Sequence, residues 1–468
     1  MENLYYMRRA IELAKKGEGW CHPNPLVGAV IVKEGRIIGE GYHERYGDLH
    51  AERNAIKNLS ESPEGAEIFV TLEPCCHHGK QPPCTEAIVS SGIKKVFIGS
   101  RDPNPLVSGK GTAYLREHGV EVIEDFLREE CDELNPVFFH YITTKRPYVT
   151  MKYAMTMDGK IATKTGRSKW ITGEPAREEV QRMRHAAMGI MAGIGTVLAD
   201  DPMLNCRIEG GRSPVRIICD SRLRIPMESQ IVKTAKEYRT IAVCGISEIA
   251  EGEITKDNVS HIAAGCFPER EIKDGEKRLN DYKEKSLKDY KGKSSKNYKE
   301  KSPKDYREKI LGLLNAGIEI INCPVCSKPD PEDEKPEYRS KEKYAEDFLI
   351  KKEGVSINSD FCVNKGDDPE KPGAVNLGKL MTILGERGLD SILLEGGGSL
   401  NESALRAGIV NEIDAFVAPK IFGGDGRSPV CWEGVTDPED AYRFSLFSVE
   451  KIGDDVLLRY RNKGGWKR

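Results

Sequence analysis

The chain has 468 residues, enough for two to four domains, and a formal net charge of −3 at pH 7. This near balance of charge does not suggest a protein that binds nucleic acid through bulk positive charge. The hydrophobic fraction is 38% and the mean hydropathy is −0.51, so some segment must be strongly polar.

The cysteine pattern and the first residues of the sequence indicate the cellular compartment. The 13 cysteines follow no disulfide framework, and the first residues lack the basic region and apolar run of a signal peptide. No stretch approaches the length of a transmembrane helix. We therefore expect a protein of the reducing cytoplasm, without a membrane partner.

The first 100 residues alternate between helical and strand patterns. Apolar residues at helical spacing predict a helix within residues 1–20. The next predicted elements are a hairpin at 26–39, a helix at 50–59, a strand at 68–72, a helix at 84–91 and a strand at 95–99. This alternation indicates a layered α/β domain.

Three short segments of this region carry residue types that bind zinc. A His-Ala-Glu triplet at 50–52 opens a predicted helix, Cys75 follows a strand, and Cys84 begins the next helix. One imidazole (His50) and two thiolates can hold Zn²⁺ and leave a fourth position for water, whose pKa the metal lowers to about 7. Glu52 would shuttle protons from that water to a leaving amine. The pattern predicts a zinc-dependent deaminase.

The loop between the two cysteines is longer than the two-residue spacer usual in nucleobase deaminases. It contains Cys76, His77 and His78, which are further potential ligands, so residue chemistry alone leaves the ligand assignment open. It also contains Lys80, a cation that a free base would not need. The loop therefore favours a substrate that carries a phosphate.

A second α/β unit begins near Tyr148, after a joint between residues 135 and 147. We place the deaminase domain at 1–145 and a second domain at 146–468. Strand patterns of the second domain occur at 189–194, 215–219, 240–244, 318–321, 391–394, 412–418 and 454–460.

Two polar stretches interrupt the second domain, at about 248–308 and 323–374. The first holds a degenerate eight-residue repeat marked by Tyr282, Tyr290, Tyr298 and Tyr306. Because residues 310–321 between the stretches still predict a helix, a glycine stop and a strand, we interpret both as insertions in one domain. We interpret the repeat as a solvated insertion. The alternatives are a charged single helix and a segment that contacts RNA or a protein partner.

A glycine-rich turn follows the strand that ends at Leu394. Gly396, Gly397 and Gly398 precede a helix that begins near Ser399, whereas no G-x-G-x-x-G fingerprint follows a strand. Glycines let a backbone approach a ligand closely, and a helix N-terminus offers N–H groups to a pyrophosphate. The turn predicts a dinucleotide site, with a plain strand-to-helix turn as the alternative.

Taken together, these motifs resemble the bifunctional deaminase/reductase family of bacterial riboflavin biosynthesis. The resemblance is carried by residues 22–30, 50–52, 73–84, 151–162 and 395–398, and it spans roughly 1–245, 310–321 and 375–468. It implies a cytidine-deaminase-like α/β/α layered domain followed by a dihydrofolate-reductase-like α/β domain that carries the polar insertions.

The resemblance also implies two reactions. The first is zinc-dependent hydrolytic deamination of 2,5-diamino-6-ribosylamino-4(3H)-pyrimidinone 5′-phosphate, with one Zn²⁺ per chain. The second is NADPH-dependent reduction of the ribosyl side chain, giving 5-amino-6-ribitylaminouracil 5′-phosphate. The implied deaminase substrate contacts are Asn24, His43, Lys80, Asn104 and Ser108.

For the reductase half, the implied cofactor contacts are Ala154, Trp170, Thr196, Asp200, Ser221, Gly397, Gly398, Ser399, Leu400, Asn401, Glu402 and Ser403. The implied substrate contacts are Ser168, Arg184, Leu204, Arg207 and Glu395. Arg184 and Arg207 match phosphate contacts, which suit a guanidinium fork. Because reducing the sugar needs proton delivery and charge control, we assign Lys152 and Asp200 as catalytic.

Other functions are weighed against this one. A cytidine or tRNA adenosine deaminase with a degenerate second domain conflicts with Lys80 and the intact glycine turn. An RNA-binding protein that uses the Lys/Tyr repeat conflicts with the near-neutral charge and the intact His-Ala-Glu triplet. A chain that keeps only one activity is a third alternative. We expect a small phosphorylated pyrimidine as substrate, a homo-oligomer (dimer or tetramer) and no nucleic-acid partner.

Overall fold

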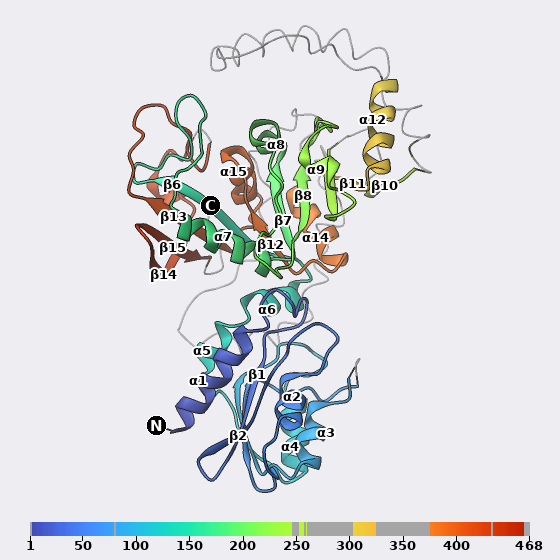
Figure 1. Cartoon of the computed structure of the whole chain (residues 1–468), viewed down its shortest axis with the longest axis vertical. Helices are drawn as coiled ribbons and strands as arrows, with labels where there is room; N and C mark the ends of the chain where they lie inside the picture. Colours follow the sequence, from blue (N-terminus) through green and yellow to red (C-terminus); the bar gives the residue numbers. More distant parts are fainter. Residues whose placement is uncertain are drawn as a thin grey trace.

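The computed structural model describes residues 2–78, 81–245, 252–256, 259, 303–323, 375–431 and 434–462. Figure 1 shows two bodies stacked along the long axis, with helix α6 (Pro136–Thr144) where they meet. No helix within the described ranges is long and apolar enough to cross a membrane. Lys80 and the repeat up to residue 302 lie outside the described residues.

The first body is a five-stranded sheet of order β2-β1-β3-β4-β5. Its elements are α1 (Glu2–Lys15), β1 (Gly28–Lys33), β2 (Arg36–Tyr42), α2 (Ala51–Lys57), β3 (Glu67–Leu72), α3 (Cys84–Ser90), β4 (Lys95–Ser100), α4 (Lys110–Glu117), β5 (Glu121–Ile123) and α5 (Arg128–Asp132). Strand β1 pairs antiparallel with β2 and β3, whereas β3, β4 and β5 run parallel.

Alternate residues of the central strands face two separate cores, as the two-residue period of a strand requires. Ala29 and Ile31 of β1 pack with α2, α3 and α4, whereas Val30 and Val32 pack with α1 and the segment around Cys131 of α5. The first body is therefore a three-layered α/β/α unit. The alternation of patterns predicted a layered α/β domain, and the family resemblance implied the three layers.

The first helix is shorter than the pattern at residues 1–20 predicted, because it ends at Lys15. Gly17 follows, and a Cβ there would lie 2.4 Å from the carbonyl oxygen of His43. The chain therefore leaves the helix to pass tightly against the end of β2. The segment 17–26 connects α1 to β1, and we call it the 17–26 loop.

The second body is a ten-stranded sheet of order β10-β11-β9-β8-β7-β12-β6-β13-β15-β14. Its first elements are β6 (Tyr148–Thr156), α7 (Glu174–Ala186), β7 (Gly189–Gly193), α8 (Ile194–Asp200), β8 (Val215–Cys219), α9 (Gln230–Lys233), β9 (Thr240–Cys244) and β10 (Gly252–Ile254). The others are α12 (Pro303–Asn315), β11 (Ile318–Asn322), α14 (Leu377–Glu386), β12 (Ser391–Leu394), α15 (Gly398–Arg406), β13 (Glu412–Ala418), a 3₁₀ turn (Pro438–Asp440), β14 (Ser445–Ile452) and β15 (Asp455–Arg461).

The seven strands from β11 to β13 in this order run parallel to one another, and their apolar residues are buried on both faces of the sheet. Burial on two faces explains why they appear in the sequence as continuous apolar runs. The antiparallel strands β10 and β14 were not predicted. Strand β10 has three residues inside the first polar stretch, and β14 is an edge strand with exposed Leu446 and Val449.

The predicted helix and strand between the two polar stretches are confirmed as α12 and β11, and β11 pairs parallel with β9. Val259, Ile310 and Leu313 are buried in one core cluster. On the far side of the second stretch, Asn376 donates its N–H to the carbonyl of Cys323, and the Cys323 thiol donates to the carbonyl of Asn376. The chain thus leaves and re-enters the fold at adjacent points.

Candidate active sites

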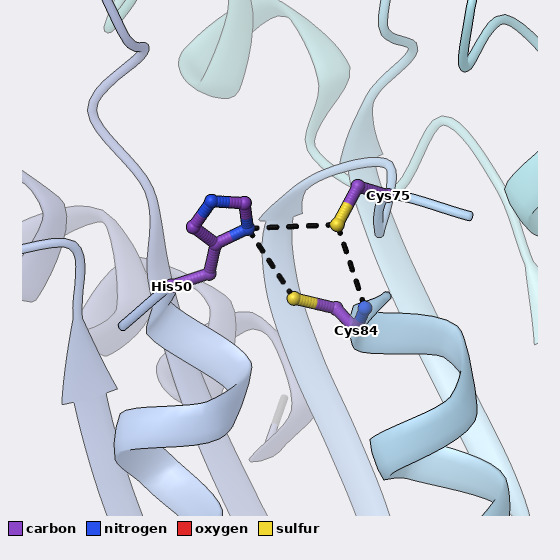
Figure 2. A group of neighbouring side chains, drawn as sticks. All are labelled: His50, Cys75 and Cys84. Atoms are coloured by element: carbon purple, nitrogen blue, oxygen red, sulfur yellow. Dashed lines mark hydrogen bonds between the residues drawn. The ribbon is translucent and has the colours of Figure 1, made fainter. Parts of the chain in front are cut away.

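The ends of three elements in the first body bring together one histidine and two cysteines. His50 is the N-cap of α2, Cys75 follows β3, and Cys84 is the first residue of α3. Helix α2 can approach β2 because Gly41 lacks a side chain; a Cβ there would lie 2.3 Å from the Ala55 nitrogen. Figure 2 shows the three side chains pointing toward one another.

The donor atoms of this group fit a zinc ion. The Nδ1 atom of His50 lies 3.5 Å from the sulfur of Cys75 and 3.4 Å from that of Cys84. All three donor atoms lie within 4.8 Å of one another, and no other such cluster occurs among the described residues. Nitrogen and sulfur donors in this number are the set that a catalytic zinc site uses while it keeps a fourth position open.

The electrostatics also favour a thiolate at this point. Cys75 accepts hydrogen bonds from the Cys84 thiol and from His50, and these lower the pKa of Cys75 to about 4 despite its burial. The backbone N–H of Cys84, at the N-terminus of α3, points to the same sulfur at 3.4 Å. A thiolate is the form that binds a metal.

Glu52 lies in the first turn of α2 and is 3% exposed. Burial, followed by the negative charge of Cys75, raises the pKa of its carboxyl. A carboxyl with a raised pKa can both accept and release a proton near neutral pH, as a proton shuttle must. Glu52 lines the same cavity as His50 and Cys75, which has a volume of about 280 Å³.

Three of the predicted substrate contacts, Asn24, His43 and Asn104, also line this cavity. His43 donates from Nδ1 to the carbonyl of Leu49 at 3.1 Å, so its Nε2 accepts from the Asn24 amide at 3.1 Å. Burial lowers the pKa of His43 and favours this neutral form. Ser108 is exposed, with its backbone N–H bonded to the carbonyl of Asn104.

Two cavity residues, Asp102 and Glu73, were not assigned a role from the sequence, and a third, His77, was named only as a further potential ligand. Asp102 lines the cavity, and burial raises the pKa of its carboxyl to about 7. Glu73 accepts the N–H groups of Gly109, Gly111 and Thr112 and so fixes the start of α4. His77 also lines the cavity; its buried Nδ1 has no hydrogen-bond partner among the described residues. The signal that could have found Asp102 and Glu73 is an acid directly after a buried strand.

In the second body, the residues assigned to reduction lie mainly at the carboxyl ends of parallel strands. Ala154 lies near the end of β6, Thr196 follows β7, Ser221 follows β8, and Glu395 follows β12. Ligands of open α/β sheets bind outside this edge. The sheet order places these strand ends side by side, although the residues are far apart in the sequence.

Glu395 is at the centre of a buried ionic cluster. Arg184 of α7 donates to both of its carboxylate oxygens, at 2.7 and 3.0 Å, and the Lys152 ammonium lies 3.9 Å from Oε2. Burial alone would raise the pKa of Glu395, but Arg184 and then Lys152 hold it at about 2. For Lys152, burial is the largest influence and lowers its pKa. Arg184, assigned to a phosphate, therefore already holds a carboxylate in this structure.

Only one of the three glycines in the glycine turn leaves open space where a dinucleotide could bind. A Cβ on Gly398 would lie 2.3 Å from the sulfur of Cys431, and one on Gly396 would lie 2.5 Å from Oδ1 of Asn401. These two glycines therefore permit packing within the protein. A Cβ on Gly397, the N-cap of α15, meets nothing within 4 Å, so a ligand can approach the helix N-terminus there.

The remaining residues assigned to the reductase are more scattered. Asp200 is exposed at the end of α8, and Arg207 is exposed but close enough for its charge to lower the pKa of Glu395. Trp170 is 65% exposed and stacks on Arg177. The others are a half-buried Ser168, a buried Leu204, and the α15 residues Ser399, Leu400, Asn401, Glu402 and Ser403, of which Asn401 is fully buried.

Comparisons with known proteins match both bodies. The family model of the cytidine and deoxycytidylate deaminase zinc-binding region matches residues 1–100, and that of the RibD C-terminal domain matches 147–262 and 332–458. The riboflavin biosynthesis protein RibD of Actinobacillus pleuropneumoniae is 43% identical over 98% of this chain and 95% of its own length. Its counterpart from Bacillus amyloliquefaciens is 34% identical over 98% of this chain and 96% of its own length.

A solved structure shares the whole arrangement. It is the diaminohydroxyphosphoribosylaminopyrimidine deaminase/5-amino-6-(5-phosphoribosylamino)uracil reductase of Thermotoga maritima, 32% identical, with 98% of each chain covered and a TM-score of 0.67. The similarity therefore extends through both sheets and is not confined to the zinc motif.

Proposed function

Because the chain belongs to the RibD family of bifunctional deaminase/reductases of riboflavin biosynthesis, we propose a specific reaction sequence for its two sites. The zinc-dependent site hydrolyses 2,5-diamino-6-ribosylamino-4(3H)-pyrimidinone 5′-phosphate, so that water replaces the 2-amino group and ammonia leaves. The NADPH-dependent site then reduces the ribosyl side chain, giving 5-amino-6-ribitylaminouracil 5′-phosphate. The observation that carries this proposal is the convergence of His50, Cys75 and Cys84 in the cavity that Glu52 lines.

In the deaminase cavity, zinc when bound acts as a Lewis acid that activates water. We assign His50, Cys75 and Cys84 as its ligands. Glu52 accepts a proton from the attacking water and delivers it to the departing amine, which its buried carboxyl suits. Asn24, His43 and Asn104 orient the pyrimidine, since they line the same cavity. Lys80 and Ser108 are assigned to the substrate by family resemblance.

At the reductase site, NADPH when bound supplies hydride to the sugar carbon. Lys152 is the group we assign to proton delivery, because its buried ammonium has a lowered pKa and therefore releases a proton more readily. Glu395 and Arg184 orient it and contact the substrate, together with Ser168, Leu204 and Arg207. Asp200 is assigned a catalytic role and, with Ala154, Trp170, Thr196, Ser221 and 397–403, a place in the cofactor site.

The organisation of the chain completes the proposal. We place the deaminase domain at 1–145 and the reductase domain at 146–468, and the presence of two separate sheets supports this division. We further propose that the chain forms a homo-oligomer, dimer or tetramer, and acts in the cytoplasm, where its cysteines stay reduced.

The test is to incubate the purified, zinc-loaded protein with the diaminopyrimidine ribosylamino phosphate, with and without NADPH, and to weigh the products. The expected result is deamination without NADPH, and deamination followed by the gain of two hydrogens with it. Deamination without reduction would overturn the second step, and an unchanged substrate would overturn the first.

A further inference from the structure

The 17–26 loop of the first body is tied to the second body. The Arg212 guanidinium donates from Nε to the carbonyl of Gly19 at 2.7 Å, and Nε2 of His185 lies 3.1 Å from the carbonyl oxygen of Glu18. His22 makes the third connection. The loop is therefore fixed by the second body and not only by its own sheet.

His22 uses both of its ring nitrogens across this boundary. Nδ1 lies 2.6 Å from Oδ2 of Asp390, and Nε2 lies 2.6 Å from the carbonyl oxygen of Ala186. A carboxylate and a carbonyl are both acceptors, so each ring nitrogen donates. The side chains of His22 and Asp390 are 17% and 2% exposed, so this ion pair is shielded from water. The other oxygen of Asp390 accepts from the Ser391 hydroxyl at 2.7 Å, which holds the carboxylate in place.

The same loop forms one wall of the deaminase cavity. Asn24, separated from His22 only by Pro23, lines the cavity and contacts His43 at 3.1 Å. The Asn24 N–H donates to the carbonyl of Cys21 at 2.8 Å, so the turn between Cys21 and Asn24 is closed. The turn therefore couples the position of the His22 backbone to that of Asn24.

The two partners of His22 belong to the elements that also build the reductase cluster. Asp390 directly precedes β12, and Glu395 directly follows it. Ala186 ends α7, and Arg184 lies two residues earlier in the same turn. His22 is thus held by β12 and α7, whose other residues form the Arg184–Glu395 pair.

From these contacts we propose that His22 is a positioning residue for the deamination reaction, and that its bonds to Asp390 and Ala186 let the reductase body complete the substrate wall of the deaminase site. The inference rests on the proposed deaminase function. It assigns His22 no contact with the reacting atoms, because His22 acts through Asn24. Asn24 is assigned to holding the pyrimidine and not to the reacting atoms, so loosening this wall should weaken substrate binding more than it slows the chemical step.

The test uses the full-length, zinc-loaded protein and two variants, His22→Gln and Asp390→Asn. In His22→Gln, the glutamine amide cannot donate hydrogen bonds in both directions from the positions of the two imidazole nitrogens. In Asp390→Asn, the asparagine removes the carboxylate charge that lies against His22. In both variants we expect the deaminase KM to rise roughly fivefold to twentyfold while kcat changes by less than about twofold. Zinc content and the rate of reduction of already deaminated substrate should match those of the wild type.

A matched control is His140→Gln. His140 is also a half-buried histidine near the junction of the two bodies, but its ring contacts Asn411 and Tyr148. We expect its deaminase KM to stay at the wild-type value. An unchanged KM in both test variants would overturn the inference, as would a joint loss of zinc, reductase activity and fold, which would mean only a structural role. A wild-type protein that does not deaminate the substrate would instead overturn the proposed function.

Discussion

The deaminase and reductase sites differ in how far apart in the sequence their residues lie. The three residues assigned as zinc ligands and Glu52 all lie within residues 50–84, at the ends of neighbouring elements of the first body. Lys152 and Arg184 precede both polar stretches and Glu395 follows them, yet the Glu395 carboxylate lies within 4 Å of both cations. The first site depends on local spacing, and the second depends on the order of strands in a large parallel sheet.

The difference also extends to what holds each site together. At the deaminase site the residues converge on a position that a metal ion suits, so their geometry is completed by a ligand. At the reductase site the Glu395 carboxylate pairs with the Arg184 guanidinium and lies near the Lys152 ammonium, so these contacts are made within the protein. Removing one member should therefore damage the first site mainly in its chemistry and the second in its stability as well.

The largest expected effect separates chemistry from folding at the deaminase site. Glu52→Gln keeps the shape of the side chain but cannot carry a proton, so kcat for deamination should fall by roughly 10²–10⁴-fold. Zinc content should be unchanged, and reduction of already deaminated substrate should proceed at the wild-type rate. Product mass spectrometry and metal analysis measure these outcomes, and retained deamination would rule out the proton-shuttle role.

Cys84→Ser tests which residues hold the metal. Mutation of a residue that only hydrogen-bonds to a metal ligand weakens metal binding roughly 10- to 100-fold. Replacing a thiolate ligand itself should weaken zinc binding by more than that. Cys76→Ser is the control, since its sulfur lies outside the cluster. Zinc titration with a competing chelator compares the variants. Unchanged affinity in the Cys84 variant would point to Cys76 or to the cavity residue His77.

These two sites also show what the sequence could and could not predict. The grouping of His50, Cys75 and Cys84 could be predicted because a His-Ala-Glu triplet and two cysteines lie close together in the sequence in a pattern typical of zinc sites. The Arg184–Glu395 pair could not, because nothing in the spacing of residues 184 and 395 says that α7 lies over the end of β12. The phosphate contact of Arg184 is implied by the family resemblance and stays a prediction. The contacts of His22 were missed for the same reason, since Asp390 is distant in the sequence.

A third change breaks the reductase cluster. Glu395→Gln leaves Arg184 and Lys152 buried without their counter-charge, which should lower the free energy of unfolding by about 3–5 kcal/mol. Reduction should be lost at temperatures where deamination persists, if the two bodies unfold separately. Glu386→Gln, at an exposed position at the end of α14, is the control. The effect would be detected by thermal unfolding experiments in which both activities are followed. Wild-type stability in the Glu395→Gln variant would contradict a stabilising role for this charge cluster.

The pH dependence of the same cluster has a defined sign. The pKa of Glu395 is lowered from 4.5 to about 2, so the folded state favours its ionised form. The stability that it contributes, about 3 kcal/mol, is fully present above pH 4.5 and is lost as the pH falls toward 2. The stability difference between wild type and Glu395→Gln should therefore shrink over that acidic range. Chemical denaturation at several pH values would measure it, and a constant difference would mean that the carboxylate is not ionised in the fold.

The smallest effect is expected from deleting residues 270–302, which hold most of the tyrosine repeat. The deletion leaves Val259 and Ile310 in their shared core cluster and the pairing of β10 with β11 intact. Because the entropy of loop closure changes by only about 0.6 kcal/mol for each doubling of length, shortening the connection should hardly alter stability. Both activities should stay within about twofold of the wild type, whereas a selective loss of reduction would show that the insertion supports the interrupted sheet. The reductase site would then depend on a segment distant from it in the sequence, and its contrast with the local deaminase site would be sharper still.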